Sequence, residues 1–324
     1  MAANIPAPLA HHPGMGSIRY PGGIAFRVWA PFASEVFVAG AFNQWSDSAN
    51  PFVHEGKGYW YTEVPEAEIG DEYKFVLQNG DQKPIWRNNP YASEMVHSGG
   101  NAVLHDPKFD WTGDDFTMPA WNELVIYEMH VGTFNDTFNR EPGTFESIIT
   151  KLPYLEKLGI NAIEIMPVAE FPVDHSWGYN PAYPFSVEKA LGGPQGLYQL
   201  VKAAHQHGIA VILDVVYNHF GPSDLDQCLW RFDDWSNAEH DGGIYFYDKK
   251  RVYTRWGHTR PDYGRKEVRQ YLRDNALFWL NKYRLDGLRF DSTVNIHRHQ
   301  HYKDGPWSDL PDGWGLIQWI NNNT

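Results

Sequence analysis

Short apolar runs separated by turn-forming residues fill the first hundred or so positions of the chain. The runs are rich in β-branched and aromatic residues and are divided by clusters of Pro, Gly, Asn and Asp; they cover 23–31, 34–42, 59–65 and 72–81. Short strands at this spacing are typical of a β-sandwich. The pattern therefore predicts a small immunoglobulin-like β-sandwich over residues 1–110.

The pattern changes from Glu123 onward, where apolar runs alternate with segments of helical periodicity. The apolar runs cover 124–131, 161–168, 209–217 and 286–290. Apolar residues at three- and four-residue spacing predict three helices between them; their buried stripes would be Phe145, Ile148, Ile149, Leu152 and Leu155, then Leu197, Leu200, Val201 and Ala204, then Val268, Leu272, Ala276, Trp279 and Tyr283. Apolar strands joined by helices indicate a parallel sheet, either doubly wound or part of a barrel.

The loops that follow the predicted parallel strands favour the barrel. No Gly-rich phosphate-binding loop follows any of these strands, which counts against a nucleotide-binding doubly wound sheet. Polar residues instead gather at the carboxyl ends of the strands, where barrel enzymes place their chemistry. We therefore expect residues 111–324 to form an incomplete TIM-type (β/α)8 barrel of about four βα units. A long insertion at about 218–263 is expected to face the substrate, and a final helix is expected in "GWGLIQWINNN".

Composition narrows the classes of partner. The 324 residues carry a formal charge of −13 with a pI near 5.5, which makes a nucleic-acid partner unlikely because binding to phosphates needs clustered Lys and Arg. Aromatic residues make up 15% of the chain and 14 of them are Trp. Such a composition suits a surface that stacks on flat apolar faces such as those of sugar rings, although any single Trp is more often part of a core.

The chain shows no sequence signal for a membrane, a disulfide or a cysteine-based metal site. The start of the chain lacks the basic and apolar segments of a signal peptide, and no long uninterrupted apolar stretch is present. A cytoplasmic protein is therefore expected. Cys228 is the one cysteine, so the chain cannot form an internal disulfide. Four acidic residues near it show no metal-ligand spacing and are expected to form a solvated loop: Asp224, Asp226, Asp233 and Asp234.

Two charged residues stand in the last apolar run, "LDGLRFDSTV" at 285–294. On a strand, side chains two positions apart point to the same face, so Arg289 and Asp291 would share one side. Such a pair is either a structural ion pair or part of a catalytic site. The residues alone leave both interpretations open.

Several motifs carry a resemblance that bears on this question. "DVVYNH" at 214–219 and "GLRFD" at 287–291 are similar to signature regions of the α-amylase superfamily of glycoside hydrolases and transglycosidases. "DHSWGYNPAYPF" at 174–185 resembles the loop after the second barrel strand of that family, and "VIYEMHVGTF" at 125–134 resembles the first barrel strand of its glucan-branching and trehalohydrolase members. "VFVAGAFNQWS" and "YKFVLQNGD" resemble the small sandwich module that precedes the barrel in branching and debranching enzymes.

The resemblance implies catalytic roles for the charged pair and substrate contacts for its neighbours. Asp291 corresponds to the nucleophile that forms a covalent glycosyl-enzyme, and Arg289 to the neighbour that orients it. A cation within about 4–6 Å favours the charged form of a carboxylate, which a nucleophile needs. Asp214 corresponds to an aspartate that contacts the arginine and shapes the sugar subsite. His219 corresponds to a histidine that binds a sugar hydroxyl, and Tyr179 to the aromatic platform at the cleavage point.

The same resemblance assigns two tryptophans to substrate binding and leaves out a metal. Trp177 would contact substrate or pack within its loop. Trp45 resembles a glucan-contacting Trp of some sandwich modules, although a Trp at this place somewhat more often packs at the interface. Asn218 corresponds to a calcium ligand in many amylases, but branching-type members often lack that ion. No metal and no other cofactor is therefore expected, and the expected partner is an α-glucan polysaccharide or oligosaccharide.

The catalytic set that the resemblance implies is incomplete in this sequence. A retaining glycosidase needs an acid/base carboxyl about 5–5.5 Å from the nucleophile, and residues 292–324 contain no Glu. We therefore expect half a barrel that is inactive alone, truncated from a longer enzyme, with two open sheet edges and an apolar inner face. Glucan branching is the favoured activity; trehalohydrolase and debranching activities, and a non-catalytic glucan-binding or regulatory protein, remain alternatives.

Overall fold

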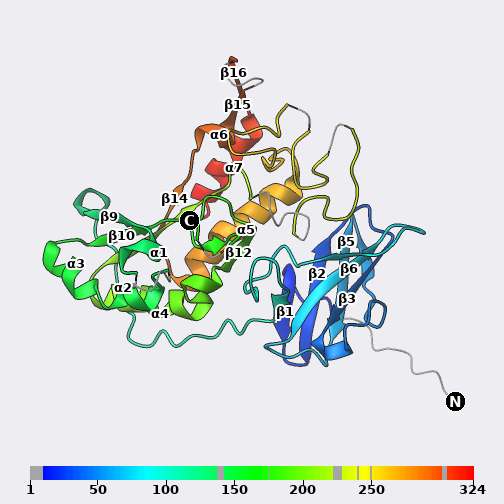
Figure 1. Ribbon diagram of the computed structural model, residues 1–324, viewed down its shortest axis with the longest axis horizontal. Coiled ribbons are helices and arrows are strands. Elements are labelled where there is room, and N and C mark those ends of the chain that lie inside the picture. Colours follow the sequence, from blue (N-terminus) through cyan, green and yellow to red (C-terminus); the bar gives the residue numbers. More distant parts are fainter. Residues whose placement is uncertain are drawn as a thin grey trace.

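The computed structural model describes residues 10–136, 142–173, 175–221, 228–238, 241–248, 250–300 and 305–324. It shows an N-terminal β-sandwich beside a larger α/β part (Figure 1). The connecting segment after the sandwich runs beneath the α/β part and reaches its far side before the first parallel strand begins (Figure 1). The predicted combination of a sandwich and a partial barrel is confirmed.

The sandwich consists of two antiparallel sheets. One has the order β1-β2-β5-β4, with strands Gly16–Tyr20, Gly23–Trp29, Tyr59–Val64 and Val53–Gly56. The other has the order β3-β6-β7, with β8 also paired to β6 and the short helix η1 after β3; their bounds are Glu35–Gly40, Glu72–Gln78, Ile85–Arg87, Ala102–Val103 and Ala41–Asn43. The four runs read from the sequence are β2, β3, β5 and β6, whose alternating apolar side chains fill the space between the sheets.

The α/β part is built on a parallel sheet with the order β14-β13-β10-β9. Its strands are Gly287–Phe290, Ala210–Val215, Ala162–Ile165 and Ile126–Met129. The expected four-stranded barrel segment is thus present. Shorter elements surround it: η2 Trp121–Glu123, α1 Val131–Phe134, β11 Ala169–Glu170, β12 Tyr183–Val187, η3 Lys189–Leu191, α6 Val294–His297, β15 Arg298–Gln300 and β16 Trp307–Asp309.

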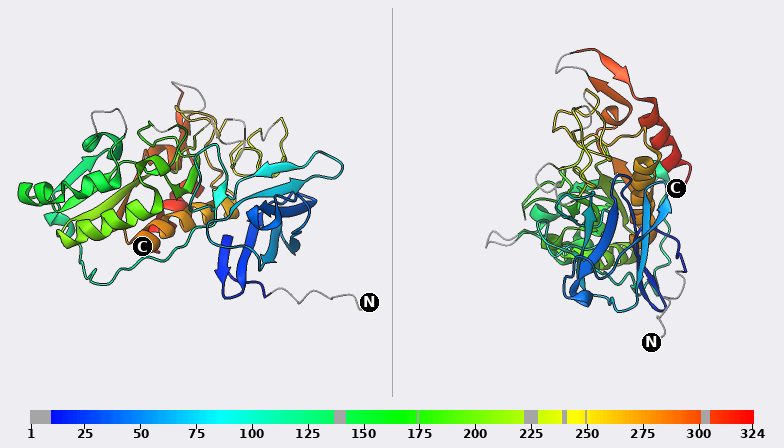
Figure 2. Two further views of the ribbon diagram at one scale, coloured as in Figure 1. Left: turned by 60° about the horizontal axis from the view of Figure 1, so that its bottom comes forward. Right: turned by 90° about the vertical axis from the view of Figure 1, so that its right-hand side faces the viewer.

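Helices cover the outer face of the parallel sheet (Figure 2). They are α2 Phe145–Ile149, α3 Leu152–Leu158, α4 Gly193–Gln206 and α5 Lys266–Tyr283, with α7 Pro311–Asn321 at the end of the chain. The first predicted helix is two helices in the structure. Pro153 lies in the first turn of α3. A proline has no N–H to donate to the preceding turn, so it starts a new helix and cannot continue α2.

The inner face of the sheet carries charged side chains, so the expectation of an apolar inner face is wrong. Register and alternation place Glu128, Glu164, Asp214 and Arg289 together on this face, at the carboxyl-terminal half of the strands. The apolar half packs against the connecting segment; the contacts join Ala162, Ala210 and Ile212 to Phe116, Met118 and Leu124. The connecting segment therefore supplies the apolar cover at one end and leaves the charged end open.

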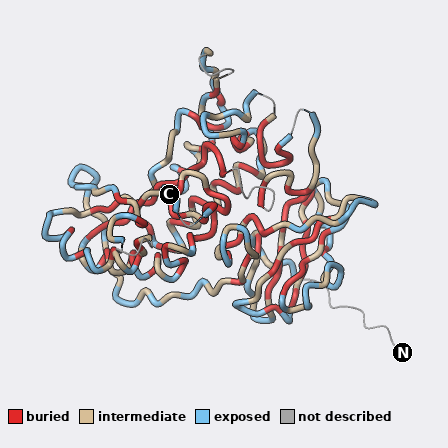
Figure 3. The backbone as a smooth tube through the Cα atoms, viewed as in Figure 1, coloured by how far each residue is buried: buried red, intermediate tan, exposed pale blue. Residues whose placement is uncertain are grey.

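The strand that carries the charged pair is less buried than its sequence suggested. β14 lies at the edge of the sheet, and the side chain of Arg289 is 42% exposed. Figure 3 shows exposed segments at the opposite edge as well, around β9, where Ile126 and Val125 are exposed. An apolar run would normally be more buried, but an edge strand has a neighbour on one side only.

The insertion between β13 and α5 docks against the sandwich through a buried carboxylate. Asp233, which was expected in a solvated loop, is fully buried. Its Oδ2 accepts a hydrogen bond from the backbone N–H of Phe32 at 3.0 Å, and Nδ2 of Asn79 donates to its backbone carbonyl at 2.7 Å. The ring of Phe32 stacks on Trp235 at 4.4 Å. Burial raises the pKa of Asp233 to about 6, and Asp224 and Asp226 lie outside the described residues.

A buried histidine ties the base of the sheet to the connecting segment. His205 of α4 contacts Asp114 at 2.7 Å and Asp286 at 3.0 Å, and its ring stacks on Phe116 at 4.5 Å. Oδ2 of Asp286 also accepts the backbone N–H of Val211, which holds the start of β14 beside β13. Burial favours the neutral imidazole, but the two carboxylates outweigh it and raise the pKa of His205. The cluster therefore sets the register of the strand that leads to Arg289.

None of the helices that the structure describes combines the length and the apolar character needed to cross a membrane. Cys228, the one cysteine of the sequence, is buried.

His205→Gln is expected to destabilise the protein by about 3 kcal/mol, because it leaves the carboxylate of Asp286 without its cation and that of Asp114 with Arg284 alone. The pKa of His205 is higher in the folded than in the unfolded chain. Its ion pairs therefore contribute stability that is fully present below about pH 6.5, the pKa in the unfolded chain. That contribution is lost as the pH rises through the folded value, so the difference between variant and wild type should shrink from pH 6 to pH 9. Urea unfolding at both pH values measures it.

His207→Gln is the matched control, because the contact of His207 with Glu156 is solvent-exposed and such pairs contribute about 0–1 kcal/mol. A pH-independent difference for His205→Gln would contradict the prediction.

Candidate active site

The carboxyl ends of β13 and β14 bring together five of the residues expected at the site. Asp214 lies on β13, Arg289 on β14, and Asp291 directly follows β14. Tyr179 and His219 come from the loops that follow β11 and β13. These residues are far apart in sequence, and the parallel register places them at one edge of the sheet.

Arg289 links the two aspartates. Its Nη1 donates to Oδ2 of Asp214 at 2.6 Å and to Oδ1 of Asp291 at 3.1 Å. Asp214 and Arg289 are register partners on adjacent strands, so the first contact follows directly from the sheet. Partial burial opposes the charge of Arg289, but the hydrogen bond and the charge of Asp214 outweigh it and raise the pKa of the guanidinium.

Asp214 is the buried member of the group, with 2% of its surface exposed. Its Oδ2 also accepts the hydroxyl proton of Tyr179 at 2.7 Å, while Oδ1 has no hydrogen-bond partner in the described part of the chain. Burial raises the pKa of Asp214, and the hydrogen bonds from Arg289 and Tyr179 oppose that rise. Burial, together with the hydrogen bond to the carboxylate of Asp214, raises the pKa of Tyr179. Asp214 therefore orients the arginine and the tyrosine ring and does not line the open cleft.

Both carboxylate oxygens of Asp291 are held in place. Oδ1 accepts from Arg289, and Oδ2 accepts from Nδ2 of Asn218 at 2.8 Å. The same amide donates to the backbone carbonyl of Asp291 at 3.0 Å, and the backbone N–H of Asp291 donates to the backbone carbonyl of Val215 at 3.0 Å. The next residue, Ser292, has a φ of 43°, which turns the chain sharply away from the sheet. Asn218 thus acts as a second support for Asp291, a contact that the sequence did not indicate.

His219 is buried beside this group and is neutral at pH 7. Its Nδ1 lies 2.5 Å from Oδ1 of Asn218, and its ring stacks on Trp256 with the centroids 5.0 Å apart. Burial lowers the pKa of His219 to about 4, although the charge of Asp291 works in the opposite direction. A neutral imidazole can bind a sugar hydroxyl without adding charge to the site.

An open cleft of about 640 Å³ exposes Asp291 between aromatic side chains; its lining consists of Ser176, Trp177, Tyr179, Asn180, His219, Trp256 and Asp291. Trp177 is 70% exposed and Trp256 is 47% exposed. Trp256 was not singled out from the sequence. It lies in the long insertion that was expected to face the substrate, but neither periodicity nor a motif marks it within that segment.

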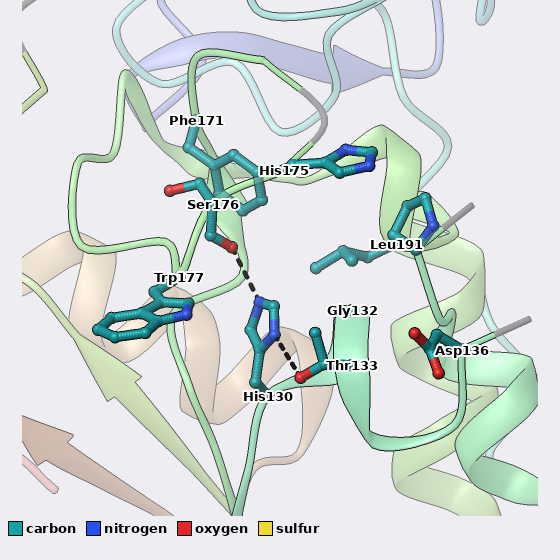
Figure 4. Close-up of a pocket in the computed structure, with 10 residues that line it drawn as sticks. His130, Gly132, Thr133, Asp136, Phe171, His175, Ser176, Trp177 and Leu191 are labelled. Atoms are coloured by element: carbon teal, nitrogen blue, oxygen red, sulfur yellow. Dashed lines mark hydrogen bonds between the residues drawn. The ribbon is translucent and has the colours of Figure 1, made fainter. Parts of the chain in front are cut away.

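A second pocket of about 290 Å³ adjoins the cleft (Figure 4). The two share Ser176 and Trp177. His130 stands between Trp177 and the side of the pocket formed by Leu191 and Asp136. Its ring nitrogens contact the backbone carbonyl of Ser176 at 2.9 Å and the hydroxyl of Thr133 at 3.0 Å. His130 therefore holds the loop that carries Trp177.

Trp45 does not join these residues. It lies on the sandwich after η1, is 36% exposed, and does not line the cleft. Its ring is 6.4 Å from that of Trp86 on β7, which is 37% exposed. The two rings form a separate aromatic patch on the sandwich.

Comparisons with known proteins identify both parts of the chain. Residues 12–92 match the profile of carbohydrate-binding module 48 (isoamylase N-terminal domain), and residues 128–253 match that of the alpha amylase catalytic domain. The chain belongs to the α-amylase superfamily. The matched segment of the catalytic domain contains Tyr179, Asp214 and His219.

Several relatives of this α-amylase superfamily chain are named as enzymes that act on glucans or malto-oligosaccharides. A malto-oligosyltrehalose trehalohydrolase from Saccharolobus solfataricus is 37% identical over 85% of this chain and 45% of its own length. A 1,4-alpha-glucan branching enzyme from Nitrosomonas europaea is 34% identical over 90% of this chain and 40% of its own length. A solved structure from Salmonella typhimurium, named as an alpha amylase, superposes with a TM-score of 0.75 at 29% identity, covering 96% of this chain and 47% of that one. The chain thus spans less than half the length of these relatives.

Arg289→Met is expected to raise the pKa of Asp214 further, because it removes the hydrogen bond and the charge that oppose the effect of burial. The folded variant would then keep Asp214 protonated up to a higher pH than the unfolded chain does. The variant should therefore gain stability as the pH falls from neutral toward the raised value. Carboxyl ¹³C chemical shifts of labelled aspartate, assigned with Asp214→Asn, measure the titration.

Arg19→Met is the control for this titration, because the contact of Arg19 with Asp106 is solvent-exposed. An unchanged titration of Asp214 in Arg289→Met would show that the arginine is not its main counter-charge.

Proposed function

We propose that this chain provides the nucleophile half of an enzyme that cleaves α-1,4-glucan with retention of configuration, through a covalent glycosyl bond to Asp291. The observation that carries the proposal is the position of the Asp291 carboxylate, which opens into an aromatic cleft while Arg289 and Asn218 fix its two oxygens. A nucleophile needs this fixed orientation, because attack requires the reacting atoms at about 3–3.5 Å in a defined direction.

The residues described at the cleft provide a nucleophile but no matching acid. Retaining enzymes use a second carboxyl group about 5–5.5 Å from the first to protonate the leaving oxygen. Asp214 is the other carboxylate at Arg289, and it is buried and engaged by Tyr179. Loss of a general acid typically costs about 10²–10⁴ in rate. We therefore expect this 324-residue polypeptide, assayed by itself, to turn over amylose poorly.

A substrate that needs no protonation separates the nucleophile from the acid. In α-maltotriosyl fluoride, fluoride departs with the electron pair of the C1–F bond while an oxygen of Asp291 forms the new bond to C1. Wild-type protein is expected to gain one maltotriosyl group, which intact-mass and peptide mass spectrometry would locate on Asp291. The adduct should persist, because its hydrolysis needs a general base.

Asp291→Asn should form no adduct, and Asp309→Asn, which changes an exposed aspartate on β16, should react like wild type. An adduct in Asp291→Asn would overturn the assignment of the nucleophile. If the wild-type protein binds maltohexaose and yet forms no adduct, the non-catalytic glucan-binding alternative gains support.

We propose glucan branching as the reaction of the whole protein, with trehalohydrolysis as the second candidate. The sandwich module and several relatives named as branching enzymes support the first. The 37% identity to a malto-oligosyltrehalose trehalohydrolase favours the second. Calorimetric titration with maltohexaose and with maltotriosyltrehalose distinguishes them: clearly tighter binding of the trehalose-terminated sugar would favour the trehalohydrolase.

We also propose that the patch of Trp45 and Trp86 on the sandwich binds α-glucan. The profile match to a carbohydrate-binding module and the partial exposure of both rings support this role. Aromatic rings present a flat apolar surface to the apolar face of a sugar ring.

Replacing both Trp45 and Trp86 with Ala should lower affinity for amylose about tenfold, since a stacking contact contributes about 0.5–1.5 kcal/mol beyond the area it buries. Affinity electrophoresis in amylose gels measures the change. Trp121→Ala is the control, because that ring is exposed on η2, outside the sandwich strands. Equal retardation of the double variant and wild type would remove the patch from the glucan-binding surface.

A further inference from the structure

One segment of the long insertion reaches the cleft and is held at two places, next to His219 and to the chain that follows Asp291. This segment, residues 251–260, is called the Trp256 arm. Trp256 stacks on His219 with an interplanar angle of 17° and lines the same cleft as Tyr179 and Asp291. Because one face of the indole covers the imidazole and the residue is still 47% exposed, the remaining surface of the ring is open to the cleft.

Thr259 fixes the arm to the chain next to His219. Its hydroxyl donates to the backbone carbonyl of Phe220 at 2.6 Å and accepts the backbone N–H of Phe220 at 3.2 Å. Both contacts are buried, so they are not weakened by competing water. The arm is thereby held against the residue that follows His219.

Arg260 fixes the arm to the segment that follows Asp291. Arg260 is 1% exposed, and within the described part of the chain its guanidinium donates to four backbone carbonyls. Two of these acceptors belong to the arm, Arg251 at 2.6 Å and Tyr253 at 2.7 Å. The other two belong to the segment after Asp291: the carbonyl of Asn295, and that of Arg298, which lies at 3.0 Å. One buried cation therefore joins the arm to the chain that follows Asp291.

A tight turn presents the indole at the tip of the arm. The hydroxyl of Thr254 accepts the backbone N–H of Trp256 at 3.2 Å, and the backbone N–H of Thr254 donates to Gly257 at 2.8 Å. Gly257 has a φ of 157°, at the limit of the range that side chains avoid. The exposed ring is thus carried on a backbone with internal hydrogen bonds.

We propose that Trp256 is a specificity-determining residue that makes glucan binding depend on chain length, and that Thr259 and Arg260 are its positioning residues. The open face of the indole receives a glucosyl ring next to the unit that lies at Tyr179 and Asp291. A single glucose unit that fills the position at Asp291 does not reach the indole, and a longer α-1,4-chain gains the full stacking interaction. The inference rests on the proposed function, since it assumes that the cleft holds an α-glucan.

The test uses calorimetric titration with glucose and with maltohexaose in a background in which Trp45 and Trp86 are Ala, so that the sandwich patch does not contribute. Trp256→Ala is expected to weaken maltohexaose binding about tenfold, the size of one aromatic stacking contact. Glucose binding should stay within about twofold of the background protein. Trp121→Ala, an equally drastic change of an exposed Trp outside the cleft, should alter neither affinity.

An isosteric pair of variants tests the positioning role. Thr259→Val removes both hydrogen bonds to Phe220 at nearly constant shape, and Thr259→Ser keeps the hydroxyl. The Val variant should lose maltohexaose affinity as Trp256→Ala does, with glucose binding retained, and the Ser variant should restore the maltohexaose affinity. A general loss of folding would instead weaken both sugars and would appear as lower stability in urea.

The outcomes separate the two levels of the proposal. Maltohexaose binding that is unchanged in Trp256→Ala would overturn the role of Trp256 and leave the proposed function intact. Equal losses for glucose and maltohexaose would overturn the dependence on chain length. Absence of any binding to the cleft in the background protein, together with no adduct from maltotriosyl fluoride, would overturn the proposed function itself.

Discussion

The candidate site depends on one guanidinium nitrogen that is shared by two carboxylates. Nη1 of Arg289 binds Asp214 within the sheet and Asp291 just beyond it. Asp214 is buried, so without this cation its charge would be unstable there. Asp291 opens into the cleft, so the same cation orients the group that we propose as the nucleophile. The structural and the chemical interpretations of the pair are therefore compatible: the contact with Asp214 holds the strands together, and the contact with Asp291 fits the proposed nucleophile.

The rest of the molecule maintains this arrangement from three directions. At the base of the sheet, His205 and Asp286 fix the start of β14. At the open end, the insertion holds the loops around the cleft and is itself docked on the sandwich through Asp233. One continuous apolar cluster runs from the sandwich to the helices of the α/β part, which explains why the sandwich acts as a support for the cleft as well as a glucan-binding candidate.

The sequence predicted those features that depend on local periodicity or on residues close to a motif. The four parallel strands, the sandwich and the helices of the α/β part follow from apolar spacing, and their order at one sheet edge follows from parallel topology. Asp214, Arg289 and Asp291 could be grouped because they end successive strands. The break before α3 was missed because the apolar stripe continues across Pro153, although the helix does not.

Contacts made by irregular segments could not be predicted. Asp233 and Trp256 lie in an insertion without strands or helices in its described residues, so no periodicity indicates that one is buried and the other faces the cleft. The partners of Arg260 within the described residues are backbone carbonyls, and such partners leave no trace in the sequence. The charged inner face was also missed, because the apolar runs were interpreted as uniformly buried while alternation placed Glu128 and Glu164 on the open side.

A crystal structure of the protein with bound maltohexaose tests the central claim most directly. The account predicts a glucosyl ring on Tyr179 with its anomeric carbon about 3–3.5 Å from the carboxylate of Asp291, while Arg289 still contacts both aspartates. Sugar bound only on the sandwich, or a ring in the cleft whose anomeric carbon is remote from Asp291, would contradict it.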